Sequence, residues 1–403
     1  MLLSMTMYLR KILNTKFLGW RLLKPILVVF SILGLSVSAC ASSSSSKSWP
    51  LWEDFKDKFV QEDGRVISNG LPNYQSFSEG QSYAMFFALV ANDQASFGRI
   101  WQWTKENLAG NNVNDNLPAW LWGKSEDGIW GAIDKNSASD ADLWIAYSLL
   151  EAGRIWKKEA YTIDALKMIA KIEAVEVVTI PTIGKFLLPG QIGFEQKDKF
   201  LTQFNASYMP LPILRRFASA SPNGPWDEIA RNTALLISAN NPNGYAVDWL
   251  SYESKPNSNP SFIIDPEKGG RGSYDAIRVY LWAGMTSKKD PLAASVMKSL
   301  YGMTEATLKN GIPPEVIDVQ LGTFSGVSPV GFSAALLPFF KTNNQIDLLN
   351  KQLNRVNKAV SDNVSQYQIE AARLPYYDYV LCLFGTGWIE KRYQFMPNGK
   401  LNN

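Results

Sequence analysis

The sequence has 403 residues, enough for one large single-core domain or two modest ones, and it contains no histidine. The lack of histidine excludes Ser-His-Asp and Cys-His catalysis and zinc sites built on histidine, so Asp, Glu, Tyr and Lys must carry any proton transfer. Residues 1–40 hold five cations and no acid, so the formal charge of +3 conceals a remainder with 35 basic and 37 acidic residues. This near-neutral balance gives no reason to expect nucleic acid as a partner.

The first 48 residues have the pattern of an export signal followed by a tether. A basic leader (1–24) precedes an apolar stretch (25–39) that is short for a membrane span and typical of a signal peptide, which we predict over 1–39. The stretch ends at Cys40 in a sequence resembling a bacterial lipobox, which predicts lipidation at Cys40 and a Ser-rich tether over 40–48. We expect a periplasmic protein anchored by lipid to the outer membrane. The alternatives are cleavage after Ala39, giving a soluble periplasmic or secreted protein, and an uncleaved anchor.

Residues 49–403 read as a succession of helices joined by loops rich in Gly, Pro and Asn, with one strand hairpin predicted from 175–179 and 186–188. A single all-α domain of packed helical hairpins is therefore expected. Two long polar loops, 110–137 and 241–272, are the kind that usually serve function. The predicted helices cover 49–59, 79–92, 94–108, 139–156, 163–176, 207–218, 226–239, 274–285, 292–309, 331–340, 344–361 and 376–384.

The helix predicted over 79–92 begins with an acid in its first turn. Ser78 and Gln81 have the spacing of a capping box, which leaves Glu79 pointing out of the helix end. No Lys or Arg lies between positions 65 and 99, and aromatic residues flank the acid, a setting that favours a protonated carboxyl. Glu79 is thus a candidate general acid. The alternative is an acid that only complements the helix dipole.

Two further acids also begin predicted helices. Asp140 opens the helix over 139–156, where it could bind sugar hydroxyls or complement the dipole, while Ser139 and Asp142 have capping-box spacing. Asp275 lies three residues before Arg278, so the guanidinium should keep it ionised, although an ordinary surface ion pair has the same spacing. One acid without a cation and one beside a cation is the contrast that a general acid and a general base require.

Aromatic residues make up 12% of the chain, more than a core alone requires, so either the core is unusually aromatic or some rings line a groove. Trp120, Trp122 and Trp130 fall in one loop, and Tyr376 and Tyr377 open a helix. Each single Trp could be core packing, but together the loop residues indicate a groove, because flat rings stack on sugar faces. Two carboxylates beside an aromatic groove describe a glycoside hydrolase.

The residues at these helix starts resemble glycoside hydrolase family 8. The run 138–156 (ASDADLWIAYSLLEAGRIW) fits the family signature throughout, 78–81 matches the segment of the catalytic acid, and 274–278 matches the segment of the catalytic base. Residues 205–208 are similar to the family's Asn-Pro-Ser-Tyr element but have Ala206 in place of Pro. Within the family, 49–55, 117–124 and 329–335 are most similar to the endoglucanases encoded with bacterial cellulose synthase.

The resemblance implies an (α/α)6 barrel that hydrolyses internal β-1,4-glucan bonds with inversion and without a cofactor, and no metal ligands are predicted. It implies Glu79 as general acid, Asp275 held by Arg278 as general base, Asp140 as a sugar ligand, and Tyr208 near the water. Trp120, Trp122 and Tyr377 are the predicted aromatic contacts of the glucan chain. The cellulose synthase complex is a possible partner by resemblance. The alternatives are a chitosanase or xylanase on the same fold, or a non-catalytic glucan-binding subunit of the cellulose export machinery.

Overall fold

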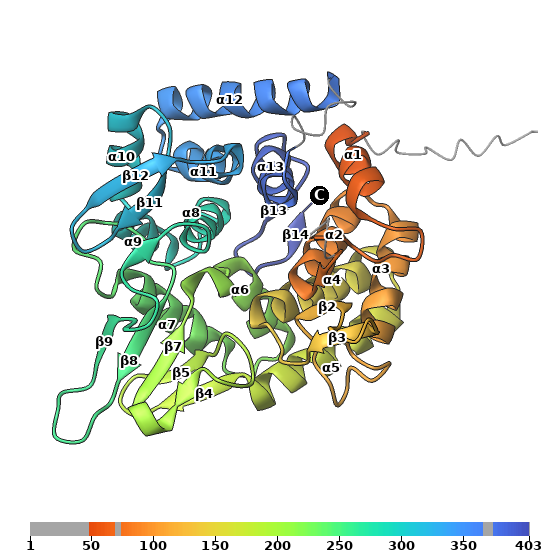
Figure 1. Cartoon of the computed structure of the whole chain (residues 1–403), viewed down its shortest axis with the longest axis horizontal. Helices are drawn as coiled ribbons and strands as arrows, with labels where there is room; N and C mark the ends of the chain where they lie inside the picture. Colours follow the sequence, from red (N-terminus) through yellow and green to blue (C-terminus); the bar gives the residue numbers. More distant parts are fainter. Residues whose placement is uncertain (1–47, 69–73, 366–373, 403) are drawn as a thin grey trace, which may run out of the picture. The chain divides into compact units, whose positions relative to one another are not determined.

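The computed structural model describes residues 48–68, 74–365 and 374–402 (Figure 1). The predicted signal peptide, the lipidation site Cys40 and the tether up to residue 47 lie outside the described residues. Among the described helices, none has both the length and the apolar composition that crossing a bilayer requires. The other cysteine, Cys382, is a fully buried free thiol, as its apolar neighbours predict.

The described chain is mostly helical, and its helices form two concentric layers. Successive inner helices pack side by side, and each also packs against an outer partner. The predicted (α/α)6 barrel is confirmed. The inner helices are α2 (Ser78–Val90), α4 (Ser139–Trp156), α6 (Leu211–Ala220), α8 (Ala276–Met285), α11 (Val330–Thr342) and α13 (Tyr376–Ile389). Their outer partners, in the same order, are α3 (Gln94–Asn107), α5 (Glu159–Val175), α7 (Trp226–Ser238), α9 (Ala293–Ser299) with α10 (Gly302–Asn310), α12 (Ile346–Ser365) and α1 (Pro50–Phe59).

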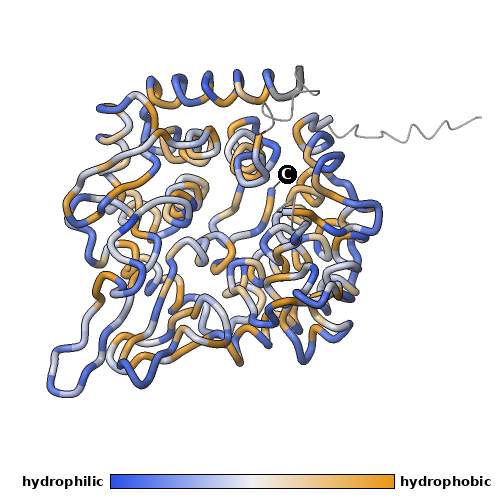
Figure 2. Tube along the Cα trace, in the orientation of Figure 1, coloured by the Kyte–Doolittle hydropathy of each residue, from blue (hydrophilic) through white to orange (hydrophobic). Residues whose placement is uncertain are grey.

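The two layers differ in burial because of their sequence patterns. Nearly every residue of α8 and α11 is buried, as expected for helices that are apolar all round. By contrast, α12 has polar residues on one face and apolar residues on the other (Figure 2), and it buries only one stripe, which includes Leu348 and Val356. Glycines allow the inner helices to approach closely: a Cβ on Gly385 would lie 1.9 Å from the carbonyl oxygen of Ala334. The barrel is therefore packed through its centre.

Aromatic rings fill the middle of the barrel and close the ring of inner helices. Phe384 of α13 lies 4.7 Å from Phe87 of α2 and 5.2 Å from both Trp144 of α4 and Trp282 of α8, measured between ring centroids. Such edge-to-face and tilted pairs add specificity to the hydrophobic burial. Much of the aromatic excess in the composition therefore belongs to the core.

Most predicted helix bounds agree with the structure, and α4 matches its predicted range of 139–156. The predicted helix 292–309 is wrong as a single element, since α9 ends at Ser299 and α10 starts at Gly302. Gly302 donates its N–H to the carbonyl of Gly244 at 3.0 Å, and this long-range bond interrupts the helical ladder. The predicted helix 207–218 also divides, into the 3-10 turn η2 (Ala206–Tyr208) and α6, because two prolines (210 and 212) restrict the backbone between them.

The predicted strand hairpin is confirmed as β4 (Val177–Ile180) and β5 (Gly184–Leu187). The expectation that little else forms strands is wrong, because both long loops contain hairpins whose burial patterns are irregular. Short antiparallel sheets thus form in the segments that connect or follow the helices (Figure 1). The other strands are β1 (Ser76–Phe77), β2 (Leu121–Lys124), β3 (Trp130–Asp134), β6 (Glu195–Gln196), β7 (Leu201–Phe204), β8 (Leu250–Glu253), β9 (Ser261–Ile264), β10 (Arg271–Gly272), β11 (Pro314–Asp318), β12 (Thr323–Val327), β13 (Gln394–Phe395) and β14 (Leu401–Asn402), and η1 (Lys197–Lys199) is a second 3-10 turn.

Candidate active site

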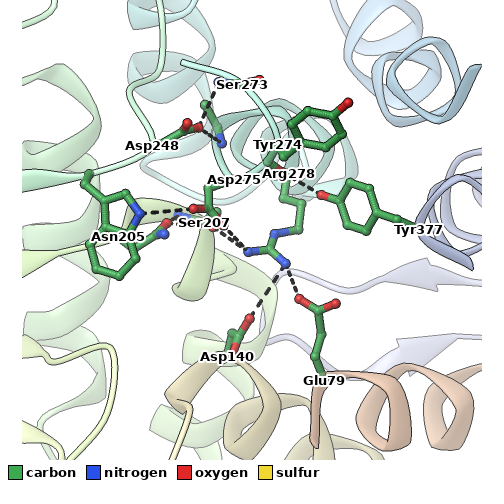
Figure 3. Close-up of polar contacts among 12 residues, drawn as sticks. Glu79, Asp140, Asn205, Ser207, Asp248, Ser273, Tyr274, Asp275, Arg278 and Tyr377 are labelled. Atoms are coloured by element: carbon green, nitrogen blue, oxygen red, sulfur yellow. Dashed lines mark hydrogen bonds and ion pairs between the residues drawn. The ribbon is translucent and has the colours of Figure 1, made fainter. Parts of the chain in front are cut away.

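The three acids predicted at helix starts converge on one guanidinium (Figure 3). Glu79 lies in the first turn of α2, Asp140 in the first turn of α4, and Asp275 immediately before α8. Arg278 contacts Glu79 through Nη1, lies 3.7 Å from Asp140 Oδ2, and donates to Asp275 Oδ1 at 2.8 Å. Arg278 lies 199 positions after Glu79 in the sequence, so a single cation joins acids that are far apart along the chain.

The expectation that Glu79 has no neighbouring cation is wrong. Arg278 comes from α8, so a search for charges near Glu79 in the sequence could not find it. The side chain of Arg278 is 4% exposed, whereas those of Glu79 and Asp275 are 26% and 29% exposed. The guanidinium is thus buried beneath two carboxylates that remain open to solvent.

The two predicted capping boxes are also wrong. The N-caps of α2 and α4 are Phe77 and Ala138, whose side chains cannot accept a hydrogen bond. Gln81 instead accepts the N–H of Val66 at 2.5 Å and donates to Thr104 Oγ1 at 2.9 Å. These contacts tie the start of α2 to a preceding turn and to α3, which holds Glu79 in place by tertiary packing.

Both carboxylate oxygens of Asp275 accept hydrogen bonds. Oδ1 accepts from Arg278, as the spacing predicted, and Oδ2 accepts from the indole Nε1 of Trp249 at 3.1 Å. Trp249 and the preceding Asp248 belong to the long loop 241–272, and the sequence analysis did not single them out. The signal was present, since a Trp beside an Asp in a loop expected to serve function is itself notable.

Asp140 is the most buried of the three acids, with 4% of the residue exposed. Burial raises the pKa of Asp140 to about 7, although Arg278 opposes the shift, and the nearby Glu79 raises it further. Oδ1 accepts the N–H of Ala141 at 2.8 Å, so Oδ2 faces the guanidinium. The cluster therefore holds a proton near neutral pH.

A second pair of acids lies behind Asp140. Asp142 and Glu176 are both fully buried, and burial raises the pKa of Asp142 well above its usual range and that of Glu176 to about 8. Glu176 accepts a hydrogen bond from Ser137 Oγ at 2.6 Å. Within the described part of the chain, the remaining three oxygens of this pair have no other hydrogen-bond partner. The two carboxyls can satisfy one another only by sharing a proton.

Tyr208 lies beside the guanidinium, with its ring centroid 5.6 Å from Arg278 Cζ. The turn η2 is fixed by Asn205, whose Oδ1 accepts from the N–H and Oγ of Ser207, and Ser207 Oγ accepts from Arg278 Nη2 at 3.1 Å. The turn thus forms with Ala206 in the place where the family has proline. Burial raises the pKa of Tyr208 well above its usual range, so this phenol stays protonated.

Tyr377 reaches the same group of residues from the start of α13. Its hydroxyl donates to the backbone carbonyl of Tyr274 at 2.6 Å, next to Asp275 (Figure 3). Burial raises its pKa too, so it acts as a hydrogen-bond donor. The predicted aromatic contact Tyr377 therefore lies within the cluster.

The tryptophans of the loop 110–137 lie beside the start of α2, because β1, which leads into α2, pairs with β2. Trp120 stacks on Phe77 with centroids 5.6 Å apart. Trp122 stacks on Trp130 at 5.2 Å, and Arg65 lies 4.3 Å from the centroid of Trp122. Trp130 is 47% exposed, so it presents more free ring surface than the two tryptophans predicted as contacts.

Comparisons with known proteins agree with this geometry. The model of a family described as glycosyl hydrolases family 8 matches residues 27–391. The chain is 44% identical to an endoglucanase of Pseudomonas fluorescens over 379 residues (92% of this chain and 95% of the relative) and 45% identical to one of Xanthomonas axonopodis over 367 residues (91% and 92%). The crystal structure of endo-1,4-D-glucanase from Vibrio fischeri has a TM-score of 0.79 at 37% identity, covering 88% of this chain and 99% of that one.

Proposed function

This chain belongs to glycosyl hydrolases family 8, and on that premise we propose that it hydrolyses internal β-1,4 bonds of glucan chains such as cellulose. The relatives at 44% and 45% identity are endoglucanases, and this chain covers more than nine tenths of their length. The observation that carries the proposal is the joining of Glu79, Asp140 and Asp275 by one buried arginine at the starts of α2, α4 and α8.

The proposed reaction uses Glu79 as general acid and Asp275 as general base. Glu79 gives its proton to the glycosidic oxygen as the bond from that oxygen to the anomeric carbon breaks. A water attacks the same carbon from the opposite face and loses its proton to Asp275. At the anomeric carbon, the bond to the water oxygen forms on the face opposite to the bond that breaks. This single displacement gives a product with the inverted anomeric configuration.

Inversion requires room for the water, which corresponds to carboxyl groups roughly 6.5–9.5 Å apart. Bridging of Glu79 and Asp275 by opposite nitrogens of one guanidinium supports a shared cleft of this scale. Arg278 donates a hydrogen bond to Asp275 Oδ1 at 2.8 Å, which holds this carboxylate in place for its role as the base. In the free protein Arg278 also contacts Glu79, so a bound sugar must replace that contact before Glu79 can act as an acid.

We assign Asp140 to the sugar at the cleavage point and Tyr208 to the attacking water. Asp140 Oδ2 lies 3.7 Å from Arg278 Nη1, and Tyr208 is a protonated donor near Asp275. Trp120, Trp122 and Tyr377 are assigned to neighbouring sugars. Trp130 joins them because of its exposed ring.

The decisive test compares Glu79→Gln and Asp275→Asn with the unmodified protein. Release of reducing sugar from carboxymethylcellulose should fall by about 10³-fold or more, while binding of cello-oligosaccharides changes little, because the amides keep the shape of the site. Proton NMR of the first product should show the inverted anomer. Turnover that survives Glu79→Gln, or a retained anomer, contradicts the assignment, and faster release from chitosan or xylan contradicts the substrate.

We further propose that the protein is exported, carries lipid at Cys40, and acts beside a cellulose synthase complex. The support is the lipobox-like end of the apolar stretch and the similarity to endoglucanases encoded with cellulose synthase. Mass spectrometry of the mature N-terminus tests the anchor. A diacylglyceryl mass on Cys40 is expected, and an unmodified N-terminus at Cys40 contradicts lipidation.

A further inference from the structure

We propose that Asp248 and Trp249 form a positioning pair that fixes the carboxylate of Asp275 toward the attacking water. The inference rests on the proposed function, in which Asp275 is the general base. It concerns two adjacent residues of the long loop before β8, neither of which has a role in the reaction described above.

Trp249 fixes the carboxylate itself. Its indole Nε1 donates to Asp275 Oδ2 at 3.1 Å, while Arg278 occupies Oδ1 at 2.8 Å. With one donor on each oxygen, the carboxylate cannot rotate about its terminal bond without losing both contacts. The lone pairs that remain point in fixed directions, as a base that must meet a water at one place requires.

The indole is itself held by its neighbours. Its ring stacks on Phe194 with centroids 6.0 Å apart and planes 11° apart, and Lys268 Nζ lies 5.8 Å from the ring. Tyr208 meets it edge to face at 6.2 Å. The donor therefore comes from a side chain that is immobilised on several sides, so its direction is set before substrate binds.

Asp248 fixes the backbone that carries Asp275. Its Oδ1 accepts the N–H of Ser273 and the N–H of Ala276, both at 2.8 Å, and these amides lie on either side of Asp275. The backbone N–H of Asp248 donates to Arg271 at 2.8 Å. Asp248 thus takes the place of an N-cap for α8, although it lies 28 positions before Ala276.

The two residues act on Asp275 with opposite electrostatic signs. The indole N–H stabilises the ionised carboxylate, whereas the charge on Asp248 repels it. Burial and the nearby Asp275 raise the pKa of Asp248 to about 6, in keeping with two acids held close together. Among the described residues, the charged or titratable groups near Asp275 and its two partners include Glu79 on α2, Asp140 on α4, Tyr208 on η2, Lys268 beside Trp249, Arg271 on β10, Tyr274, Arg278 on α8 and Tyr377 on α13.

The test is the pH profile of kcat/KM on carboxymethylcellulose for two variants of the full-length protein. Trp249→Phe removes the N–H and keeps a ring, so the acidic limb should move up by about one pH unit, the size expected for one hydrogen bond to a charged group. Asp248→Asn keeps an oxygen for the two backbone amides and removes the charge, so the same limb should move down by about half a unit. Opposite shifts would not arise from general loosening of the fold.

Trp101→Phe is the matched control. Its indole donates to a carboxylate oxygen of Asp164 at 3.2 Å, between α3 and α5 and away from the cluster. The acidic limb of this variant should stay unshifted, and thermal melting of all three variants measures any loss of fold. The proposal is overturned if Trp249→Phe and Asp248→Asn leave the limb in place, or if both move it in the same direction.

Failure of this inference is distinguishable from failure of the proposed function. If Asp275→Asn abolishes turnover and the limb of Trp249→Phe does not move, Asp275 is the base without a positioning pair. If Asp275→Asn retains turnover, Asp275 is not the general base, and the inference of a positioning pair is then also wrong.

Discussion

The two ends of helix α4 both bury carboxylates, but they balance the charges in opposite ways. Near its start, a single guanidinium, that of Arg278, contacts each of Glu79, Asp140 and Asp275. Farther along the helix, Glu151 is fully buried and pairs with both Arg154 at 2.5 Å and Arg216 at 2.6 Å.

The second cluster is also completed by backbone groups. Leu401 of β14 donates its N–H to Glu151 at 2.8 Å, and Arg154 donates to the carbonyl of Leu401 at 2.7 Å. Every charge there has a partner, so the cluster is suited to hold the fold. The cluster at the helix start has more acid than base, which is costly for stability and useful for moving protons.

The largest effect should come from Arg278→Lys, which removes the guanidinium that joins the three acids near the start of α4. An ammonium cannot bridge three carboxylates as a planar guanidinium does, so kcat/KM should fall by about 10³-fold. The measurement is the rate on carboxymethylcellulose across pH. Arg215→Lys is the control, because Arg215 of α6 also lies between two carboxylates, at 2.7 Å from Asp227 and from Asp290, and contacts none of the three acids of the cluster in the described chain. Equal losses of kcat/KM in the two variants would contradict a special role for the cluster around Arg278.

Glu151→Gln should weaken the cluster of Glu151, Arg154 and Arg216 and so lower stability, without a large change in kcat. Removing this carboxylate strands two guanidiniums, one of them 9% exposed, so we expect the free energy of unfolding to fall by about 3–5 kcal/mol. Urea unfolding at neutral pH measures the change. The kcat of the folded fraction should remain within about twofold, and a large specific loss of kcat would show that the two ends are coupled.

Glu176→Gln should have a smaller effect, on the buried pair that Glu176 forms with Asp142. Because burial raises the pKa of both Asp142 and Glu176, this pair contributes most stability below pH 4, and the contribution is lost as pH rises through about 8. The variant lacks the buried carboxyl of Glu176, which would otherwise lose its proton as the pH rises, and the new amide can donate a hydrogen bond to Asp142. The free energy of unfolding at pH 9 should therefore rise by about 1–2 kcal/mol relative to the unmodified chain.

The check on this prediction is chemical denaturation at pH 5 and pH 9. Glu159→Gln is the control, since Glu159 lies exposed in the first turn of the same helix α5. A variant that keeps the full decline in stability between the two pH values would show that the buried pair does not share a proton.

Local patterns in the sequence predicted much of the fold and part of the site. Apolar spacing gave the range of α4 without error, and the three-residue spacing of Asp275 and Arg278 gave their contact. Both features depend on residues within one or two turns of helix. The acid at each helix start was visible for the same reason.

Features that depend on distant partners could not be predicted from local patterns. Arg278 contacts Glu79 from 199 positions away, and Gln81 bonds to Val66 and Thr104 instead of capping its own helix. The hairpins within the long loops were missed because their strands are short and pair beside a barrel that determines which side chains are buried. Trp249 lies in a loop that was expected to serve function, but its partner Asp275 was not predictable, because only the fold brings the two side chains together.

The bond between Glu151 and Leu401 joins groups 250 positions apart. While the ribosome is still working, α4 has emerged but β14 has not been made, so the carboxylate of Glu151 lacks its backbone donor. The native charge balance at that end can form only after the residues near 401 have left the ribosome. The charge balance beside Glu151 is therefore among the last features of the barrel to form.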